Sequence, residues 1–170
     1  MTPPLVFITG ASSGIGQALA ARYAKAGWRL ALASRRVGEI ENWARAQGLG
    51  AERCIAYAAD VQQIDAIVGA GRRCIDEQGL PDVVIASAGV SIGMDSEIRD
   101  DLDMMRDMFE LHNVGTAATF HPFLGGMRRR YCELRRSRSV AKMSFRAERG
   151  IAQAAVGPLH AAPTTTRNTS

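Results

Sequence analysis

A glycine-rich turn near the start of the chain is the part of the sequence best suited to chemistry. Three glycines, with three residues and then one residue between them, lie in the octapeptide Thr9-Gly10-Ala11-Ser12-Ser13-Gly14-Ile15-Gly16. A glycine in a tight turn adopts backbone angles closed to other residues. The free N–H groups and partial positive charge at a helix start attract phosphate groups. The octapeptide therefore predicts a phosphate-binding turn, with Ser12 and Ser13 as further hydroxyl donors.

The elements that must position this turn repeat one order along the chain. Short apolar runs predict buried strands at 5–9, 30–33, 54–58 and 82–86. Periodic or helix-forming stretches predict helices at 17–24, 37–47, 64–75 and 97–126. Alternation with short connections implies a parallel sheet with right-handed crossovers and helices on both faces. We expect an α/β fold, a Rossmann-like doubly wound sheet of about four strands. In the last helix, the apolar residues spaced as a core face are Leu102, Met105, Met108 and Phe109.

Composition places the chain among cytoplasmic globular proteins. Its 170 residues suffice for one domain with a real core, and 46% hydrophobic residues exclude global disorder. No apolar run approaches the roughly 20 residues that a membrane helix needs, and the N-terminus does not resemble a signal peptide. Cys54, Cys74 and Cys132 lack metal-ligand spacing. The cysteines therefore predict reduced thiols in the cytoplasm and no metal site, and the lack of a long apolar run predicts no membrane segment.

The octapeptide resembles the Thr-Gly-x-x-x-Gly-x-Gly signature of short-chain dehydrogenases and reductases, in the strand–turn–helix context that the signature requires. The resemblance covers about residues 5–127. It implies NAD(P) binding and hydride transfer between a nicotinamide and a small alcohol or carbonyl substrate. It also implies that Gly10, Gly14 and Gly16, together with Ile15, form the turn around the pyrophosphate, and that subunits can pair as homo-oligomers.

Two arginines at the end of the second strand bear on the choice of coenzyme. Dehydrogenases that use NAD usually place an acidic residue near this position to bind the ribose 2′-hydroxyl. This chain has Arg35 and Arg36 there, which suit the 2′-phosphate of NADP through charge-assisted hydrogen bonds. We therefore expect NADP, with NAD as the alternative. The structural alternative is a pair of solvated surface arginines.

Three later matches complete the resemblance. Asp60-Val61 is similar to the family segment whose acidic residue bonds the adenine amino group, although Asp60 could instead cap the following helix. Ala88-Gly89 resembles the segment that borders a cofactor ribose, but Ala86 and Ser87 replace the usual asparagine pair before it. Asn113 is similar to the family asparagine that holds a water linked to the catalytic lysine. It would be the surviving member of the catalytic set.

The rest of the family's catalytic set is missing. Family members continue through a fifth strand bearing a catalytic serine and then a Tyr-x-x-x-Lys helix, in which the lysine acidifies the tyrosine. The three tyrosines are Tyr23, Tyr57 and Tyr131, and Tyr131 is followed at the fourth position by Arg135. We therefore expect the chain to be inactive as an oxidoreductase. A nucleotide-binding module without catalysis is the alternative function.

The chain changes character near residue 127. Residues 1–126 hold 11 Lys/Arg and 15 Asp/Glu, whereas residues 127–170 hold 10 and 2. We expect an NAD(P)-binding domain over 1–127 and an irregular, partly disordered basic tail over 128–170, with a short helix possible over 152–156 and disorder over 163–170. A shift of the coding frame near 127–131 would explain the tail. The competing explanation is a genuine adapter for an acidic partner or nucleic acid.

The frame shift is the favoured explanation, because the tail has too few aromatic residues for base stacking and nucleic-acid binding is not favoured. Loss of later strands also has a consequence for folding. The fourth strand, central in a complete domain, becomes an edge with unpaired backbone groups. We expect a marginal, aggregation-prone truncated fold.

Overall fold

A computed structural model describes residues 2–148 of the chain, with side chains described as far as Arg135. Residues Met1–Tyr131 form one compact unit, and Cys132–Ser170 form a second. Within the described residues, no helix combines the length and the apolar character needed to cross a membrane.

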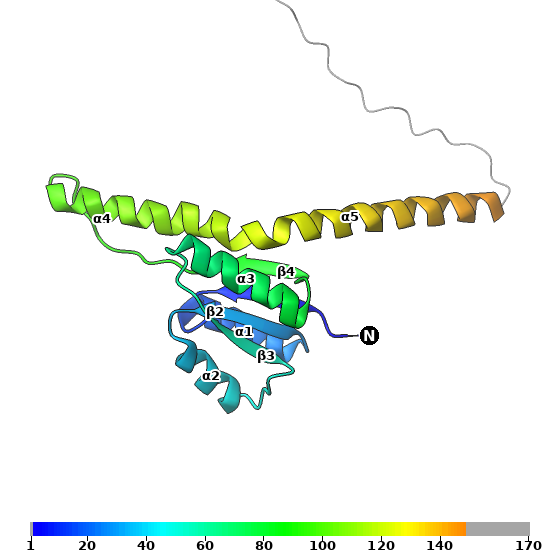
Figure 1. The fold of residues 1–170 in the computed structure, drawn as a ribbon, viewed down its shortest axis with the longest axis horizontal. Helices are drawn as coiled ribbons and strands as arrows, with labels where there is room; N and C mark the ends of the chain where they lie inside the picture. The colour runs from blue at the N-terminus through cyan, green and yellow to red at the C-terminus, as the bar shows by residue number, and fades with distance from the viewer. Residues whose placement is uncertain (1, 149–170) are drawn as a thin grey trace, which may run out of the picture. The chain divides into compact units, whose positions relative to one another are not determined.

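Four strands and the helices between them build the first unit (Figure 1). The elements in chain order are β1 (Leu5–Thr9), α1 (Gly14–Lys25), β2 (Arg29–Ser34), α2 (Val37–Ala46), β3 (Cys54–Ala58), α3 (Ile64–Gln78), β4 (Val83–Ala86), α4 (Arg99–Phe109), the π-helical turn η1 (Glu110–Val114) and α5 (Gly115–Glu148). All four strands agree with the sequence-based prediction, with bounds that differ by at most one residue.

The strands form one parallel sheet in the order β3-β2-β1-β4. Phe7 in β1 pairs with Ala31 in β2 and with Val84 in β4. This order is the first part of the 3-2-1-4-5-6 order of doubly wound folds, so the Rossmann-like prediction is confirmed. β4 lies at one margin of the sheet, and the carboxyl ends of all four strands meet along one edge.

Alternate residues of the buried strands supply two cores, one on each face of the sheet. Leu5 and Phe7 face α3 and the start of α5, where the Phe7 and Phe123 rings lie 4.9 Å apart. Val6 and Ile8 face the opposite way and pack with residues of α1 and α2, including Ala20 and Ile40. Helices therefore cover both faces, as Figure 1 shows for α1 and α3. This alternation is the period of two expected of strands buried on both sides.

Glycines let the start of α5 approach the rest of this unit closely. A Cβ on Gly71 of α3 would lie 2.4 Å from Cγ of Pro122, which stands inside α5. A Cβ on Gly115 would lie 2.9 Å from the Val61 carbonyl oxygen. Because real Cβ atoms do not come this close to other atoms, larger residues at these positions would push α5 away. The first turns of α5 are thus held against α3 and the loop after β3.

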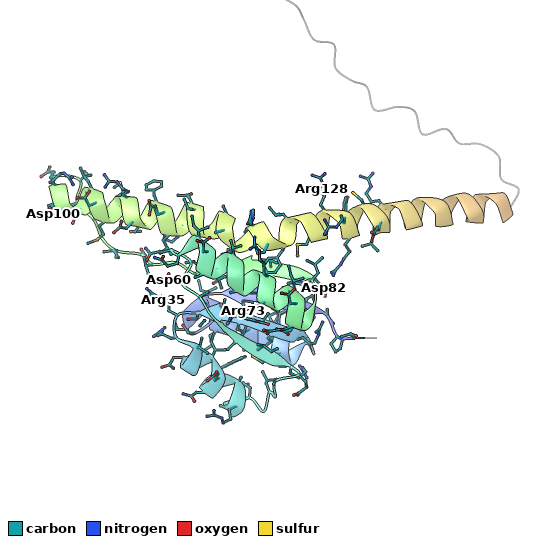
Figure 2. The ribbon with its side chains drawn as sticks, viewed as in Figure 1. Arg35, Asp60, Arg73, Asp82, Asp100 and Arg128 are labelled. Atoms are coloured by element: carbon teal, nitrogen blue, oxygen red, sulfur yellow. The ribbon has the colours of Figure 1, made fainter. Side chains whose placement is uncertain are left out.

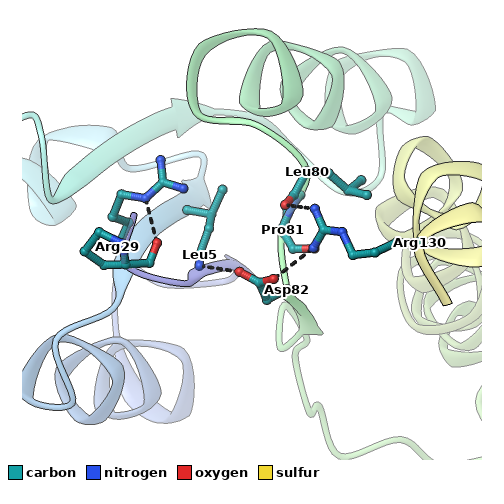
Figure 3. A network of polar contacts seen from close by, with 7 residues as sticks. Leu5, Arg29, Leu80, Pro81, Asp82 and Arg130 are labelled. Carbon is teal, nitrogen blue, oxygen red and sulfur yellow. Dashed lines mark hydrogen bonds and ion pairs between the residues drawn. The ribbon is translucent and has the colours of Figure 1, made fainter. Parts of the chain in front are cut away.

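Arg130 of α5 forms side-chain contacts with the segment that leads into β4 (Figure 3). Its guanidinium donates to the carbonyl oxygens of Leu80 and Pro81 and forms a 2.8 Å ion pair with Asp82. The other carboxylate oxygen of Asp82 accepts the N–H of Leu5 at 2.9 Å. One carboxylate therefore links α5 to the starts of both β1 and β4.

The apolar face predicted for the helix over 97–126 does not form part of the core. No residue of α4 is buried, and Leu102 and Phe109 are 42% and 63% exposed. The expectation that these residues pack in the core is wrong. Helical spacing identifies a face but not the surface that covers it, and the sheet described here ends at β4. The helix is also divided, because η1 interrupts it before α5 begins.

The segment after residue 127 also differs from its prediction. The sequence predicts irregular structure from residue 128, but α5 continues as a helix to Glu148. Arginine, glutamate, leucine and alanine all have good helix propensity, so a helix forms here without an apolar period. The helix expected over 152–156 and the disorder expected over 163–170 lie outside the described residues.

Candidate functional site

The glycine-rich turn connects β1 to α1 at the carboxyl edge of the sheet. Gly10 and Gly14 have φ angles of 69° and 55°, in the left-handed region that favours glycine. Ser13 is the N-cap residue of α1, and its hydroxyl makes no capping bond. The first helical bond of α1 runs from the Gln17 N–H to the Ser13 carbonyl. The amides that precede it remain at the open end of the helix, where an anion is favoured.

Steric contacts also explain the glycines at positions 10 and 16. A Cβ on Gly16 would lie 2.4 Å from the Gly10 carbonyl oxygen, and a Cβ on Gly10 would lie 2.7 Å from Cα of Ala88. The turn is therefore folded tightly on itself and against the segment after β4. A Cβ on Gly14, by contrast, would meet no other atom within 4 Å. Gly14 thus leaves open space in front of the turn, beside the Ile15 side chain, which is 75% exposed.

The two arginines after β2 have different surroundings. The Nη2 atom of Arg36 donates to the hydroxyl oxygens of Ser12 and Ser13 at 3.2 and 3.0 Å. Arg35 points to Asp60 and forms an ion pair of 3.8 Å with it. Figure 2 shows Arg35 and Asp60 close together at the carboxyl edge of the sheet, far from Asp82 at the opposite edge. Arg36 therefore adds its charge to the glycine-rich turn, whereas the charge of Arg35 is partly balanced.

Asp60 does not cap the helix that follows it. The N-cap residue of α3 is Gln63, and the Oδ1 atom of Asp60 accepts the N–H of Gln62 within the preceding turn. The alternative of a helix-capping role is therefore wrong. The second carboxylate oxygen of Asp60 faces Arg35, and Val61 beside it is buried.

The segment after β4 forms the opposite wall of the site. The Thr9 hydroxyl oxygen accepts the N–H groups of Ser87 and Ala88 at 3.2 and 3.4 Å, which joins the ends of β1 and β4. Further along, the Nε2 atom of His112 lies 2.8 Å from the Val90 carbonyl oxygen. A threonine of the neighbouring strand thus holds the first two residues after β4.

These walls enclose a cleft of about 560 Å³ at the carboxyl edge of the sheet. It brings together every residue predicted to bind the cofactor: Gly10, Ser12, Ser13, Gly14, Ile15, Gly16, Arg35, Arg36, Asp60, Val61, Ala88 and Gly89. Sequence reasoning missed several further lining residues, among them Gln62, Val90 and Leu111. Gln62 and Val90 directly follow the predicted segments Asp60-Val61 and Ala88-Gly89, so their place in the lining could have been inferred from the sequence. The place of Leu111 depends on the position of η1, which the sequence does not indicate.

Asn113 lies outside this cleft lining. It belongs to η1, its side chain is exposed, and its Nδ2 atom donates to the Phe109 carbonyl oxygen at 3.0 Å. Its partner is thus its own helix. The predicted role of Asn113 in catalysis remains a prediction.

The titratable groups with shifted pKa values lie in other places. Burial raises the pKa of Cys54 to about 11 and that of Cys74 to about 12. Burial also raises the pKa of Tyr57, whose hydroxyl donates to Glu77 and accepts from Gln78. None of these groups lines the cleft. Among the residues that the structure describes, no cluster of side chains could hold a metal ion. The cleft is suited to binding an anionic ligand because Arg36 and the start of α1 lie at its edge.

Comparison with known proteins connects the chain to one family. A family model described as short chain dehydrogenase matches residues 4–133, which extends past the end expected at residue 127. An uncharacterized oxidoreductase of Mycobacterium tuberculosis is 34% identical over 133 residues, which are 75% of this chain and 38% of that protein. The chain thus spans about two-fifths of the length of this relative.

Solved structures show the same fold. A short-chain dehydrogenase from Streptomyces avermitilis superimposes with a TM-score of 0.67 at 29% identity, over 76% of this chain and 46% of the other. An alcohol dehydrogenase from the archaeon Thermococcus sibiricus, complexed with 5-hydroxy-NADP, gives a TM-score of 0.65 at 28% identity. That match covers 74% of this chain and 54% of the other.

Proposed function

Because the chain belongs to the short-chain dehydrogenase family, we propose that it is an NADP-binding module of that family and does not catalyse hydride transfer by itself. The observation that carries the proposal is the position of Arg36. Its guanidinium is hydrogen-bonded to Ser12 and Ser13 at the glycine-rich turn. A cation, two hydroxyls and a helix N-terminus converge there on one side of the cleft, and a phosphate group satisfies all three.

The glycine-rich turn would hold the pyrophosphate. Gly14 leaves its backbone open to an approaching ligand, and the first residues of α1, whose amides have no partner within the helix, line the same cleft. Ile15 would be covered by the ligand, which explains why a large apolar side chain stands 75% exposed beside a polar turn. These features fit an extended dinucleotide that crosses the start of α1.

Arg36 would select the 2′-phosphate. Its planar guanidinium can donate to a phosphate while it stays near Ser13. Arg35 supports the same preference less strongly, because Asp60 already attracts its charge. NAD lacks the 2′-phosphate, so Arg36 would lose an ionic partner but would not clash sterically with the ligand. NAD binding is therefore weaker and not abolished.

The adenosine portion would lie between the loop after β3 and the segment after β4. Asp60 has a carboxylate oxygen at the cleft that can accept a hydrogen bond from the adenine amino group, and Val61 offers an apolar contact. Gly89 and Ala88 would border a ribose, because their small size keeps this wall thin. The Thermococcus sibiricus relative complexed with 5-hydroxy-NADP supports an NADP-type ligand for this arrangement.

The bound coenzyme would supply hydride exchange with a small alcohol or carbonyl compound, the reaction of oxidoreductases in this family. No Tyr-x-x-x-Lys pair occurs in the sequence, so the chain by itself would lack the proton donor that the resemblance implies for that reaction. Asn113 is the member of the catalytic set that we propose to be retained. Its present bond to Phe109 would have to be exchanged for one to water.

Cell location and assembly are further parts of this proposal. Three free cysteines fit the reducing cytoplasm. Homo-oligomers are compatible with the exposed apolar residues of α4, such as Leu102 and Phe109.

The test measures binding and turnover in the same sample. Calorimetric titration with NADPH should give a saturable one-to-one isotherm, and the same titration with NADH should show weaker binding. A panel of small aldehydes, ketones and alcohols is then added. The absorbance of the nicotinamide should change no faster than it does without the protein. A folded sample that binds neither coenzyme would refute the proposal, and steady turnover would refute its second part.

A further inference from the structure

The wall of the cleft that follows β4 has no secondary structure of its own. Residues 87–90 continue from the strand as irregular backbone. Its first half is fixed by the Thr9 hydroxyl, which accepts the N–H groups of Ser87 and Ala88. Gly89 and Val90 lie beyond the reach of these bonds, although both line the cleft. A second support is needed if this half of the wall is to keep one shape.

His112 provides that support from a different part of the chain. Its Nε2 atom lies 2.8 Å from the Val90 carbonyl oxygen. Because a carbonyl can only accept a hydrogen bond, Nε2 carries the hydrogen and donates it. The imidazole also stands directly beside Gly89, where a Cβ would lie 2.8 Å from the Cε1 atom of His112. One ring therefore both bonds the wall and packs against it.

The π-helical turn η1 sets this ring in place. Leu111 is buried and lines the cleft, whereas the next residue, His112, is exposed and reaches over to Val90. Turns of this type are rare and often occur at functional sites, because the extra residue per turn redirects neighbouring side chains. Here the neighbouring side chains are those of Leu111, which lines the cleft, and His112, which bonds the wall of the cleft.

We infer that His112 is a positioning residue for the proposed dinucleotide site, acting through the backbone of Gly89 and Val90. The inference rests on the proposed function for the identity of the ligand, but its structural part can be tested without any ligand. His112 acts at the wall after β4, whereas Arg36 acts at the glycine-rich turn. Loss of the ring should therefore weaken NADP and NAD binding by the same factor.

The first experiment compares amide hydrogen exchange of residues 87–93 in the ligand-free native chain and three variants. His112→Leu removes the donor at similar size, and His112→Gln keeps a donor of similar reach. His121→Leu removes an exposed histidine of α5 that does not line the cleft. A net hydrogen bond of ordinary strength predicts about three- to tenfold faster exchange in this segment for His112→Leu alone. Exchange in β1 and β2 should stay unchanged.

The second experiment measures the dissociation constants of NADPH and NADH for the same proteins. His112→Leu should raise both by about three- to tenfold and keep their ratio, and His112→Gln should stay within about twofold of the native values. Unchanged exchange in His112→Leu, or equal losses in His112→Gln and His112→Leu, would overturn the inference. Faster exchange in His112→Leu together with no coenzyme binding by the native chain would support the positioning role and overturn the proposed function.

Discussion

The Nη2 atom of Arg36 lies 3.0 Å from the hydroxyl oxygen of Ser13, so the N-cap residue of α2 is bonded to the N-cap residue of α1. The two residues belong to different strand–helix connections, and the parallel sheet brings them to one edge. Positive charge from the guanidinium and from the helix N-terminus is concentrated at this point. This site and other buried contacts of the fold lead to four testable predictions.

Replacing Arg36 should change the preference between coenzymes. In Arg36→Ala, the dissociation constant of NADPH should rise about tenfold, because a charge-assisted bond to the 2′-phosphate is lost. The constant for NADH, which has no such phosphate, should change less than about twofold. Calorimetric titration measures both. Arg45→Ala, at an exposed position of α2, is the matched control and should leave both constants unchanged. Equal weakening of both coenzymes in Arg36→Ala would contradict the assignment.

Replacing Gly10 should destabilise the fold. Its φ of 69° is strained for alanine, and the new Cβ would lie 2.7 Å from the Ala88 Cα, which is backbone and cannot rotate away. Strain and overpacking together predict a loss of about 2–4 kcal/mol in the free energy of unfolding for Gly10→Ala. Urea unfolding followed by circular dichroism measures this loss.

Gly69→Ala is the control for that experiment. Gly69 lies inside α3, and a Cβ there would meet no atom within 4 Å. Alanine should therefore raise stability by about 0.5–1 kcal/mol through helix propensity. A Gly10→Ala variant as stable as the native chain would show that the turn is looser than described.

Replacing Arg130 should weaken the attachment of the start of α5. Arg130→Ala removes the bonds to the carbonyls of Leu80 and Pro81 and to the carboxylate of Asp82. Because the ion pair is half-exposed, solvent screens it, and we expect a loss of about 0.5–1.5 kcal/mol in the free energy of unfolding. Arg128→Ala, at another position of the same helix, should have almost no effect. Equal losses in the two variants would argue for a general charge effect.

Stability should fall as pH rises above 9. Burial raises the pKa of Cys54 to about 11 and of Cys74 to about 12, from 9.0 for an ordinary thiol. Between these values the unfolded chain loses protons that the folded chain keeps, so ionisation favours unfolding. The contribution is fully present below pH 9 and decreases as pH rises from 9 towards 12.

Urea midpoints at pH 7, 9 and 10 measure this dependence. Cys74→Ala should make the decrease shallower because one of the raised thiols is gone. Cys132→Ala, which removes an exposed thiol, should keep the slope of the native chain. A flat profile between pH 9 and 10 would contradict the burial of these thiols.

Local patterns were enough to predict the sheet and most of the cleft. Leu5–Thr9 is continuously apolar up to a threonine, and the glycines that follow fix where α1 begins. Parallel topology then brings the residues after each strand to one edge. For this reason the sequence alone places Arg36, Asp60 and Gly89, which are far apart along the chain, at one cleft.

Contacts between distant segments could not be predicted in the same way. The bond from His112 to Val90 joins residues 22 apart and depends on a π-helical turn that no sequence pattern indicates. The exposure of Phe109 depends on what lies beyond α4, which its own spacing does not specify. The helix that continues past residue 127 has helix-forming residues without apolar periodicity, so a method based on periodicity does not detect it.

The position of β4 also affects how copies of the chain can meet. Its outer side carries backbone donors and acceptors that no other strand in residues 2–148 uses. Such a margin can pair with an extended segment of another molecule. Whether molecules stay separate would then depend on protein concentration, and dilution should restore single chains as long as the added pairing is reversible.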